Sequence, residues 1–204
     1  ATVAAYVREN GYSVDLIDTV VLGITEDKLL AHLRKHRPKV FAITAITFDF
    51  GRATKFCEQV RGEFPDMLIV IGGVHAHLQP FEVMDSHRCY DILVYGTEGE
   101  LTFEELMNRY RDTGYSREAF LKSDLNNLKG IVYRQDGKSV KTLPMPIIDN
   151  LDILPFPARD LLPMDKYLPL PNQYLKPPVV SMVVSRGCIF KCTFCNEGRK
   201  HGFR

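Results

Sequence analysis

The sequence predicts an α/β protein built on a doubly wound parallel sheet, and three observations carry that prediction. Short apolar runs alternate with amphipathic helical patterns over residues 1–112, as in strands joined by crossover helices. The run 67–71 is apolar at every position, as expected for a strand covered on both faces. From Gly130 the pattern changes to a hairpin and a proline-rich stretch, which marks the end of this domain.

The individual elements follow from periodicity and from residues that end helices. Apolar residues recur at helical spacing in each predicted helix, for example Leu29, Leu30 and Leu33, and Pro65 marks the end of the third helix. The predicted helices span residues 1–10, 26–35, 52–64, 80–85 and 99–110, and the predicted strands span residues 13–17, 40–44, 67–71 and 91–95. A sheet of this type begins with a strand, so we expect the chain to begin just after that strand.

The second half predicts a hairpin, a connector and one further strand. The pair Asp136-Gly137 between residues 130–134 and 139–143 is a strong hairpin signal. Nine of the twelve prolines lie between Pro144 and Pro178, which indicates an ordered connector laid over a surface, or a linker. Residues 179–184 form an apolar run that predicts a new strand. The expected domains are therefore 1–112, then the hairpin and connector at 113–178, then 179–204.

Composition and charge exclude several classes of protein. The net charge of +1 gives no reason to expect nucleic acid or an acidic membrane surface as a partner. No apolar run approaches the roughly 20 residues of a membrane span, and the first residues lack the features of a signal peptide. Five cysteines, of which three are clustered, argue against a secreted disulfide scaffold and favour a metal site in a reducing cytoplasm.

The cysteine cluster is the strongest chemical signal. Cys188, Cys192 and Cys195 lie within eight residues, directly after the predicted strand 179–184. Three thiolates supply one ligand too few for a closed four-iron cluster, so the fourth iron would stay open to a substrate or cofactor. The alternative is a zinc knuckle that adds His201, although structural zinc sites more often use paired cysteine knuckles.

Three loops at the carboxyl ends of predicted strands form the second signal. Open α/β sheets bind ligands at this edge, and glycine lets a ligand approach the backbone closely. The candidate binding residues are Thr44, Ala45 and Thr47 in the first loop, Gly72, Gly73, Val74 and His75 in the second, and Gly96, Thr97, Glu98, Gly99 and Glu100 in the third. A bulky residue at Gly73 is predicted to block the ligand and leave the fold mostly intact. Taken singly, these loops could be tight turns, and the two glutamates could be helix caps.

These motifs resemble those of cobalamin-binding radical S-adenosylmethionine proteins. The cysteine spacing, the preceding Ser185-Arg186-Gly187, the connector 151–160 and the three loops together resemble that family over nearly the whole chain. The resemblance implies a flavodoxin-like cobalamin-binding domain at 1–112, followed by the first strand and cluster loop of a truncated radical S-adenosylmethionine barrel. It also implies that Phe194 lies beside the adenine of S-adenosylmethionine.

The same resemblance implies the cofactors and the reaction class. The cofactors are cobalamin, a [4Fe-4S] cluster and S-adenosylmethionine, which the reduced cluster cleaves to start radical chemistry. The expected reaction of the full protein is methyl transfer to an unactivated carbon or a ring-forming rearrangement, with a small-molecule substrate and a flavodoxin- or ferredoxin-type electron donor. The chain alone is expected to be inactive. The alternatives are a methylthiotransferase, and a cobalamin or nucleotide carrier with a structural zinc.

Three histidines and two cysteines elsewhere in the chain predict no further site. His87 offers an incomplete match to the Asp-x-His-x-x-Gly motif that ligates cobalt, so we interpret it as a surface helix residue and expect no histidine on cobalt. His32 and His36 lie four residues apart on a helix, but we expect a solvated face without an acidic partner. Cys57 and Cys89 are expected to be small buried apolar groups.

Overall fold

The structure is a computed structural model that describes residues 1–168, 172, 176, 179–190 and 192–195. Its sheet has five strands in the order β1-β2-β3-β4-β5. These strands are β1 (Val40–Thr44), β2 (Leu68–Gly72), β3 (Ile92–Val94), β4 (Ile131–Gln135) and β5 (Lys138–Lys141). The helices are α1 (Thr2–Glu9), α2 (Glu26–His36), α3 (Phe50–Glu63), α4 (Val74–Leu78), α5 (Pro80–Ser86), α6 (Gly99–Asp112) and α7 (Arg117–Lys122).

The sheet is mixed, with a parallel part that places the candidate loops. Strands β1, β2 and β3 are parallel, and the register pairs Thr44 with Gly72 at their carboxyl ends. The predicted hairpin is present, but β4 pairs antiparallel with β3 and extends the same sheet. The sequence pattern did not indicate this pairing. Ile131 and Val132 are fully buried, so β4 contributes to the core of the α/β domain.

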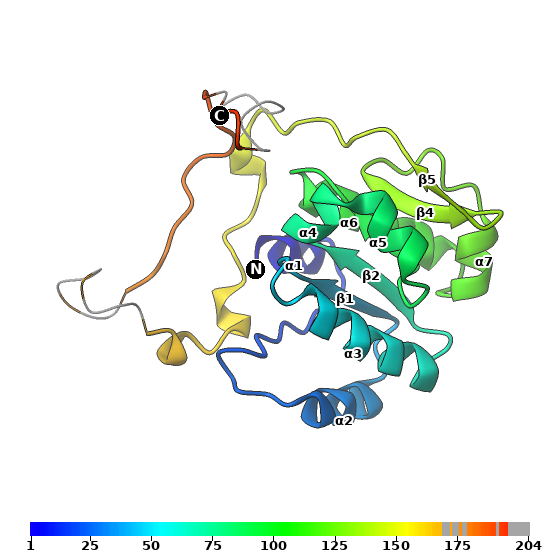
Figure 1. Ribbon diagram of the computed structural model, residues 1–204. Coiled ribbons are helices and arrows are strands. Elements are labelled where there is room, and N and C mark those ends of the chain that lie inside the picture. The colour runs from blue at the N-terminus through cyan, green and yellow to red at the C-terminus, as the bar shows by residue number, and fades with distance from the viewer. Residues whose placement is uncertain (169–171, 173–175, 177–178, 191, 196–204) are drawn as a thin grey trace.

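Helices cover both faces of the sheet, as the doubly wound prediction requires (Figure 1). Alternate strand residues divide the core into two clusters. On one face Ile69, Ile71 and Leu93 pack with residues of α2, α3, α4 and α5. On the other face Leu68 and Val70 pack with residues of α1, α6 and α7.

A buried carboxylate ties helices to the amino ends of the strands. Asp91, which directly precedes β3, is 2% exposed and accepts a hydrogen bond from the Ile69 backbone N–H at 2.8 Å. Arg117 of α7 donates to its Oδ1 at 2.7 and 2.9 Å, and Arg61 of α3 donates to its Oδ2. This cluster lies at the end of the sheet opposite the candidate loops.

The proline-rich connector contacts the rest of the chain at residues 158–161 and at Tyr167. It contains three short 3-10 helices, Leu151–Ile153, Arg159–Leu161 and Met164–Lys166. Ala158 is 1% exposed and packs against Ala4 and Ala5 of α1. Arg8 donates to both carboxylate oxygens of Asp160, at 2.5 and 3.1 Å. The prediction of an ordered connector laid over a surface is therefore confirmed for these residues.

Two predicted strands are absent from the described structure. Residues 13–17 run without regular secondary structure, and residues 179–184 do likewise. Val183 and Val184 are 89% and 84% exposed. A β-strand needs a hydrogen-bonded neighbour, and among the described residues neither segment pairs with a strand. The strand predictions for both segments are therefore wrong for this structure, and the start of a barrel at 179–184 is not formed.

Candidate functional site

The first two candidate loops meet at the carboxyl edge of the sheet. Because β1 and β2 are parallel and in register, the chain leaves both strands on the same side. The Ala45 N–H donates to the Gly72 carbonyl at 3.4 Å, and the His75 N–H donates to the Ala45 carbonyl at 3.4 Å. The loop that contains Thr44, Ala45 and Thr47 is thus bonded to the loop that contains Gly72 and His75.

Gly73 shapes this contact, and the structure corrects our expectation for it. Its φ of 94° is one that side-chain-bearing residues rarely adopt. A Cβ atom here would lie 2.4 Å from the Thr44 hydroxyl oxygen and 2.9 Å from the Ala45 carbonyl oxygen. A larger residue at Gly73 would therefore push the two loops apart, so the expected separation of ligand binding from folding is wrong for this position.

Two histidines of α4 extend the contact to the neighbouring loops. The Nδ1 atom of His75 lies 3.2 Å from the Thr47 hydroxyl, and its ring packs on Phe50 with centroids 4.0 Å apart. His77 accepts a hydrogen bond at Nδ1 from the Gly96 backbone N–H at 3.0 Å, which links the second loop to the third. Sequence reasoning missed His77, which lies two residues after His75 in the short helix α4 that was not predicted.

The surface at this edge is apolar and exposed. Four apolar side chains point outward from the first two loops and α4: Ile46 is 55% exposed, Phe48 92%, Val74 57% and Leu78 42%. Gly96 has a φ of 94° and nothing within 4 Å of the position its Cβ would take, so the space beside it is open. A flat, largely apolar ligand that also needs backbone hydrogen bonds fits such a surface.

The two glutamates of the third loop point inward. Glu98 and Glu100 have side chains that are only 1% and 4% exposed. Arg186 donates to both oxygens of Glu100, at 2.6 and 3.1 Å, and lies 3.4 Å from Glu98 Oε2 and from the Thr97 carbonyl. Burial acts to raise the pKa of Glu100, but the Arg186 hydrogen bond and its own backbone N–H outweigh burial and hold the pKa below its usual value. The Thr97 hydroxyl donates to Glu98 at 2.9 Å, and Gly99 starts α6 close to Val3.

The cysteine loop is accessible and bonded to itself at two points. Cys192 is exposed, and Cys188 and Cys195 are partly exposed. The Cys195 N–H donates to the Cys192 carbonyl at 3.1 Å, and the Phe190 N–H donates to the Cys188 sulfur at 3.5 Å. Three accessible thiols suit an iron–sulfur cluster by donor type. In the described part of the chain, no three His, Cys, Asp or Glu side chains are placed to hold a metal ion. Phe194 is 92% exposed, and His201 lies outside the described residues.

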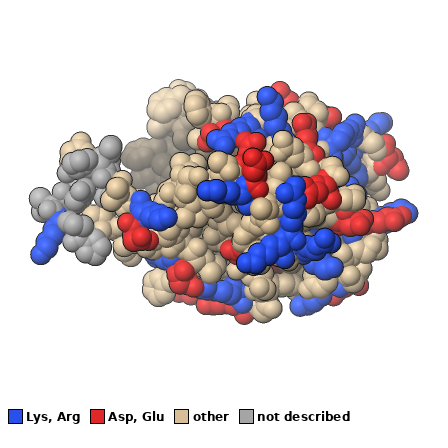
Figure 2. Space-filling model, turned by 90° about the horizontal axis from the view of Figure 1, so that it is seen from below, with Lys and Arg blue, Asp and Glu red and all other residues tan. Residues whose placement is uncertain are grey.

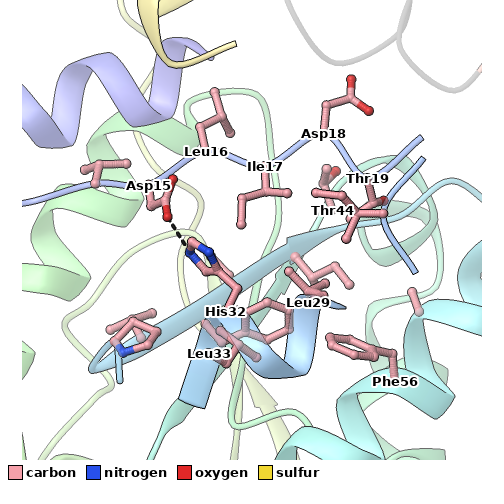
Figure 3. Close-up of a pocket in the computed structure, with 18 of the residues that line it drawn as sticks. Asp15, Leu16, Ile17, Asp18, Thr19, Leu29, His32, Leu33, Thr44 and Phe56 are labelled. Atoms are coloured by element: carbon pink, nitrogen blue, oxygen red, sulfur yellow. Dashed lines mark hydrogen bonds and ion pairs between the residues drawn. The ribbon is translucent and has the colours of Figure 1, made fainter. Parts of the chain in front are cut away.

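A cavity of about 680 Å³ lies beside β1 and reaches Thr44 of the first loop (Figure 3). One long wall is β1 itself and the other is the segment 12–19. Helices of both sheet faces line it, with Leu29, Leu33 and Phe56 from one face and Val7, Phe103 and Met107 from the other. We call this cavity the edge slot, because it continues the plane of the sheet beyond the free edge of β1. An extended strand placed between these two walls would lie next to β1, at the edge of the sheet.

The remaining histidines and cysteines lie outside the site. His32 approaches Asp15 across the edge slot, with Nε2 2.5 Å from Oδ2, so our expectation that it lacks an acidic partner is wrong (Figure 3). His87 follows α5, is half-buried and packs near Phe50, with ring centroids 5.3 Å apart. Cys57 and Cys89 are buried as expected, and burial raises their pKa values to about 12 and about 11.

Two further features are the distribution of surface charges and the length of the helices. On the face shown in Figure 2, Lys and Arg side chains are interspersed with Asp and Glu side chains. None of the described helices is both long and apolar enough to cross a bilayer.

Comparison with known proteins gives matches over both halves of the chain. The sequence model of the B12 binding domain matches residues 1–107. An uncharacterized methyltransferase of Pyrococcus horikoshii is 33% identical over all of this chain and 41% of its own length. The anaerobic magnesium-protoporphyrin IX monomethyl ester cyclase of Rubrivivax gelatinosus is 29% identical over 97% of this chain and 34% of its own length. The chain thus spans less than half the length of these curated relatives.

A solved structure shares the fold. The radical S-adenosylmethionine methyltransferase TsrM from Kitasatospora setae, solved with cobalamin and a [4Fe-4S] cluster bound, aligns with a TM-score of 0.58 and 15% identity. The alignment covers 74% of this chain and 26% of that protein.

Proposed function

We propose, on the premise that this chain belongs to the B12 binding domain family, that its α/β domain binds cobalamin at the carboxyl edge of β1, β2 and β3. One observation carries the proposal. The stretch that matches the family, residues 1–107, contains all three candidate loops, and those loops are hydrogen-bonded to one another at one sheet edge. This is the edge where open α/β sheets bind ligands.

The chemistry of the edge supports a corrin ligand. Phe48 and Val74 offer exposed apolar contacts to a flat macrocycle, and the open space beside Gly96 lets the polar rim or tail of such a ligand approach the chain closely. His75 and His77 each make a hydrogen bond through Nδ1, with Thr47 and with Gly96, and neither belongs to an Asp-x-His-x-x-Gly motif of the kind that ligates cobalt. His87 lies against Phe50. We therefore propose that cobalt is held without a histidine from this chain.

The cysteine loop supports a second cofactor site in the whole protein. We propose that Cys188, Cys192 and Cys195 hold a [4Fe-4S] cluster whose open iron takes S-adenosylmethionine. When bound, this pair supplies a carbon-centred radical. The chain's own part is to provide three thiolates and to leave one iron uncoordinated. Phe194 is exposed beside Cys195 and so is available to stack on the adenine.

The names of the relatives set the range of reactions for the whole protein. They include methyltransferases and ring-forming cyclases, so we propose methyl transfer to an unactivated carbon or a ring-forming rearrangement of a small molecule. One-electron reduction of the cluster would come from a flavodoxin- or ferredoxin-type donor.

The proposal is tested by metal analysis and spectroscopy of the anaerobically purified whole protein. We expect about one cobalt and about four irons per chain, with the absorption bands of cobalamin and of an iron–sulfur cluster. Cys192→Ala should remove the iron and leave the cobalt, whereas Cys57→Ala, a buried cysteine, should leave both. Zinc at one per chain in place of iron would favour a structural knuckle, and absence of cobalt would contradict the cobalamin site.

A further inference from the structure

The third loop contains two buried carboxylates. A carboxylate that stabilises the amino terminus of a helix is usually a single exposed group. Glu98 precedes α6 and Glu100 lies in its first turn, and their side chains are 1% and 4% exposed. Acidic groups do stabilise a helix amino terminus, but they do so from the surface. Two buried like charges at one point are unfavourable unless a cation pairs with them. A cationic partner must therefore stabilise the two glutamates at this position.

Arg186, which follows Glu100 by 86 residues in the sequence, supplies the positive charge. Its guanidinium forms a two-point bond with Glu100 and lies 3.4 Å from both Glu98 Oε2 and the Thr97 carbonyl. The guanidinium geometry matches a carboxylate at both oxygens, which a lysine cannot reproduce. The Arg186 side chain is 21% exposed, whereas the neighbouring apolar side chains are mostly in solvent, with Val184 at 84% and Ile189 at 71%.

The bond fixes the segment that carries the cysteines. Arg186 lies two residues before Cys188, and Gly187 between them has a φ of 83°, which turns the chain at that point. Arg159 also donates a hydrogen bond to the Ser181 carbonyl, at 3.0 Å, but this bond lies five residues before Arg186 and uses a single donor. The Arg186 cluster is therefore the main anchor of the cysteine loop, and it is attached to the loop that also carries Gly96.

We propose that Arg186 is a positioning residue that locks the cysteine loop to the third loop of the α/β domain through Glu98 and Glu100. The lock fixes the distance between the cluster site and the ligand edge. In this arrangement the two glutamates hold the cysteine loop and do not contact a cofactor. The part that concerns two cofactors rests on the proposed function, but the attachment of residues 181–190 to the α/β domain does not.

The attachment is tested first on the chain as it stands, by hydrogen exchange. Arg186→Gln should speed amide exchange in residues 181–190 by about tenfold, with little change in the middle of α6. The matched control is Arg8→Gln, which removes another two-point arginine–carboxylate bond, but an exposed one with Asp160. It should leave residues 181–190 unchanged. Equal exchange of these residues in Arg186→Gln and wild type would overturn the lock, whatever the cofactors.

The functional consequence is tested in the cofactor-loaded whole protein. Arg186→Gln should keep wild-type cobalt and iron contents, while the magnetic interaction between reduced cluster and cob(II)alamin weakens and kcat falls about tenfold. Arg186→Lys should restore only part of both. An unchanged magnetic interaction and kcat in Arg186→Gln would overturn the positioning role. Failure of the wild type to bind cobalt or iron would instead contradict the proposed function. The hydrogen-exchange experiment would then be the test of the attachment between Arg186 and the third loop.

A second variant covers the case in which Arg186→Gln destabilises the domain by leaving two buried carboxylates unpaired. Arg186→Gln combined with Glu100→Gln removes the same bond but leaves one buried carboxylate. It should show the same faster exchange at 181–190 and the same loss of magnetic interaction. Wild-type behaviour of this double variant in both measurements would overturn the proposal.

Discussion

Gly73 fixes the contact between the first two loops because its backbone conformation and its missing side chain are both required. Alanine there adds a strained φ and a contact of 2.4 Å with the Thr44 hydroxyl. We expect Gly73→Ala to lower the free energy of unfolding by about 2 kcal/mol or more. Gly72→Ala is the control, since its Cβ would meet only the Val94 carbonyl, at 3.7 Å. The measurement is denaturant unfolding, and equal stability of the two variants would contradict the geometry.

The five cysteines should divide into two classes by reactivity. Cys57 and Cys89 are buried, and burial raises their pKa values to about 12 and about 11, so near pH 7.5 both thiols stay protonated and shielded. A thiol reagent should therefore titrate three cysteines rapidly in the folded, metal-free chain and all five after unfolding. Rapid titration of all five in the folded chain would show that the core around α3 and β3 is not closed.

At the scale of elements, Asp91 joins α3, α7 and the start of β2 through one buried carboxylate. Asp91→Ala would leave Arg61 and Arg117 without their partner, and removing one member of a buried ion pair costs about 3–5 kcal/mol. Asp160→Ala, which removes an exposed pair with Arg8, should cost less than about 1 kcal/mol. Denaturant midpoints measure both changes. Similar losses in the two variants would contradict the importance of burial at Asp91.

The edge slot gives a second prediction at this scale. It is lined by core helices of both sheet faces and by the free edge of β1, and Ala1 is among its lining residues. An apolar segment of five or six residues, joined ahead of Ala1 by a short turn, should pair with β1 and raise the melting temperature by about 5 °C or more. A polar Gly-Ser extension of equal length is the control. No difference between the two extensions would show that the slot does not take a strand.

Elements with local signals were predicted closely, and those that depend on distant contacts were not. The strand 40–44 and the helices at 26–35 and 99–110 follow from periodicity within the segment, and the structure places them within a few residues of those bounds. The short helix α4 was missed because a helix of five residues shows little periodicity in the sequence. The pairing of β4 with β3 was missed because the sequence of a hairpin does not indicate which strand the hairpin pairs with.

In the candidate site, too, features with a local signal were predicted and features that depend on distant contacts were not. Which loops lie together followed from the parallel sheet, and the structure confirms the proximity of Thr44, Gly73 and Gly96 through hydrogen bonds and close packing. What the glutamates contact could not be predicted. Glu98 and Glu100 meet an arginine 88 and 86 residues away, and no local pattern encodes a partner at that separation.

At the scale of the whole molecule, the chain combines an α/β domain, a packed connector and a cysteine loop that returns to the ligand edge. The connector passes α1, where Ala158 is buried, and Arg186 then contacts the third loop (Figure 1). The two sites that the sequence indicated separately are thus bonded through Glu98 and Glu100.

The central claim is that the carboxyl edge of the sheet binds cobalamin, and titration of the chain with hydroxocobalamin tests it most directly. We predict saturable binding, followed by visible absorbance, that Phe48→Glu weakens by about tenfold or more because it places a charge on the apolar edge. Lys39→Glu introduces the same residue at the opposite end of β1 and should leave the affinity unchanged. The reduced cobalt should show no nitrogen hyperfine splitting from a protein histidine. Absence of binding at micromolar concentrations, or equal weakening by the two variants, would contradict the claim.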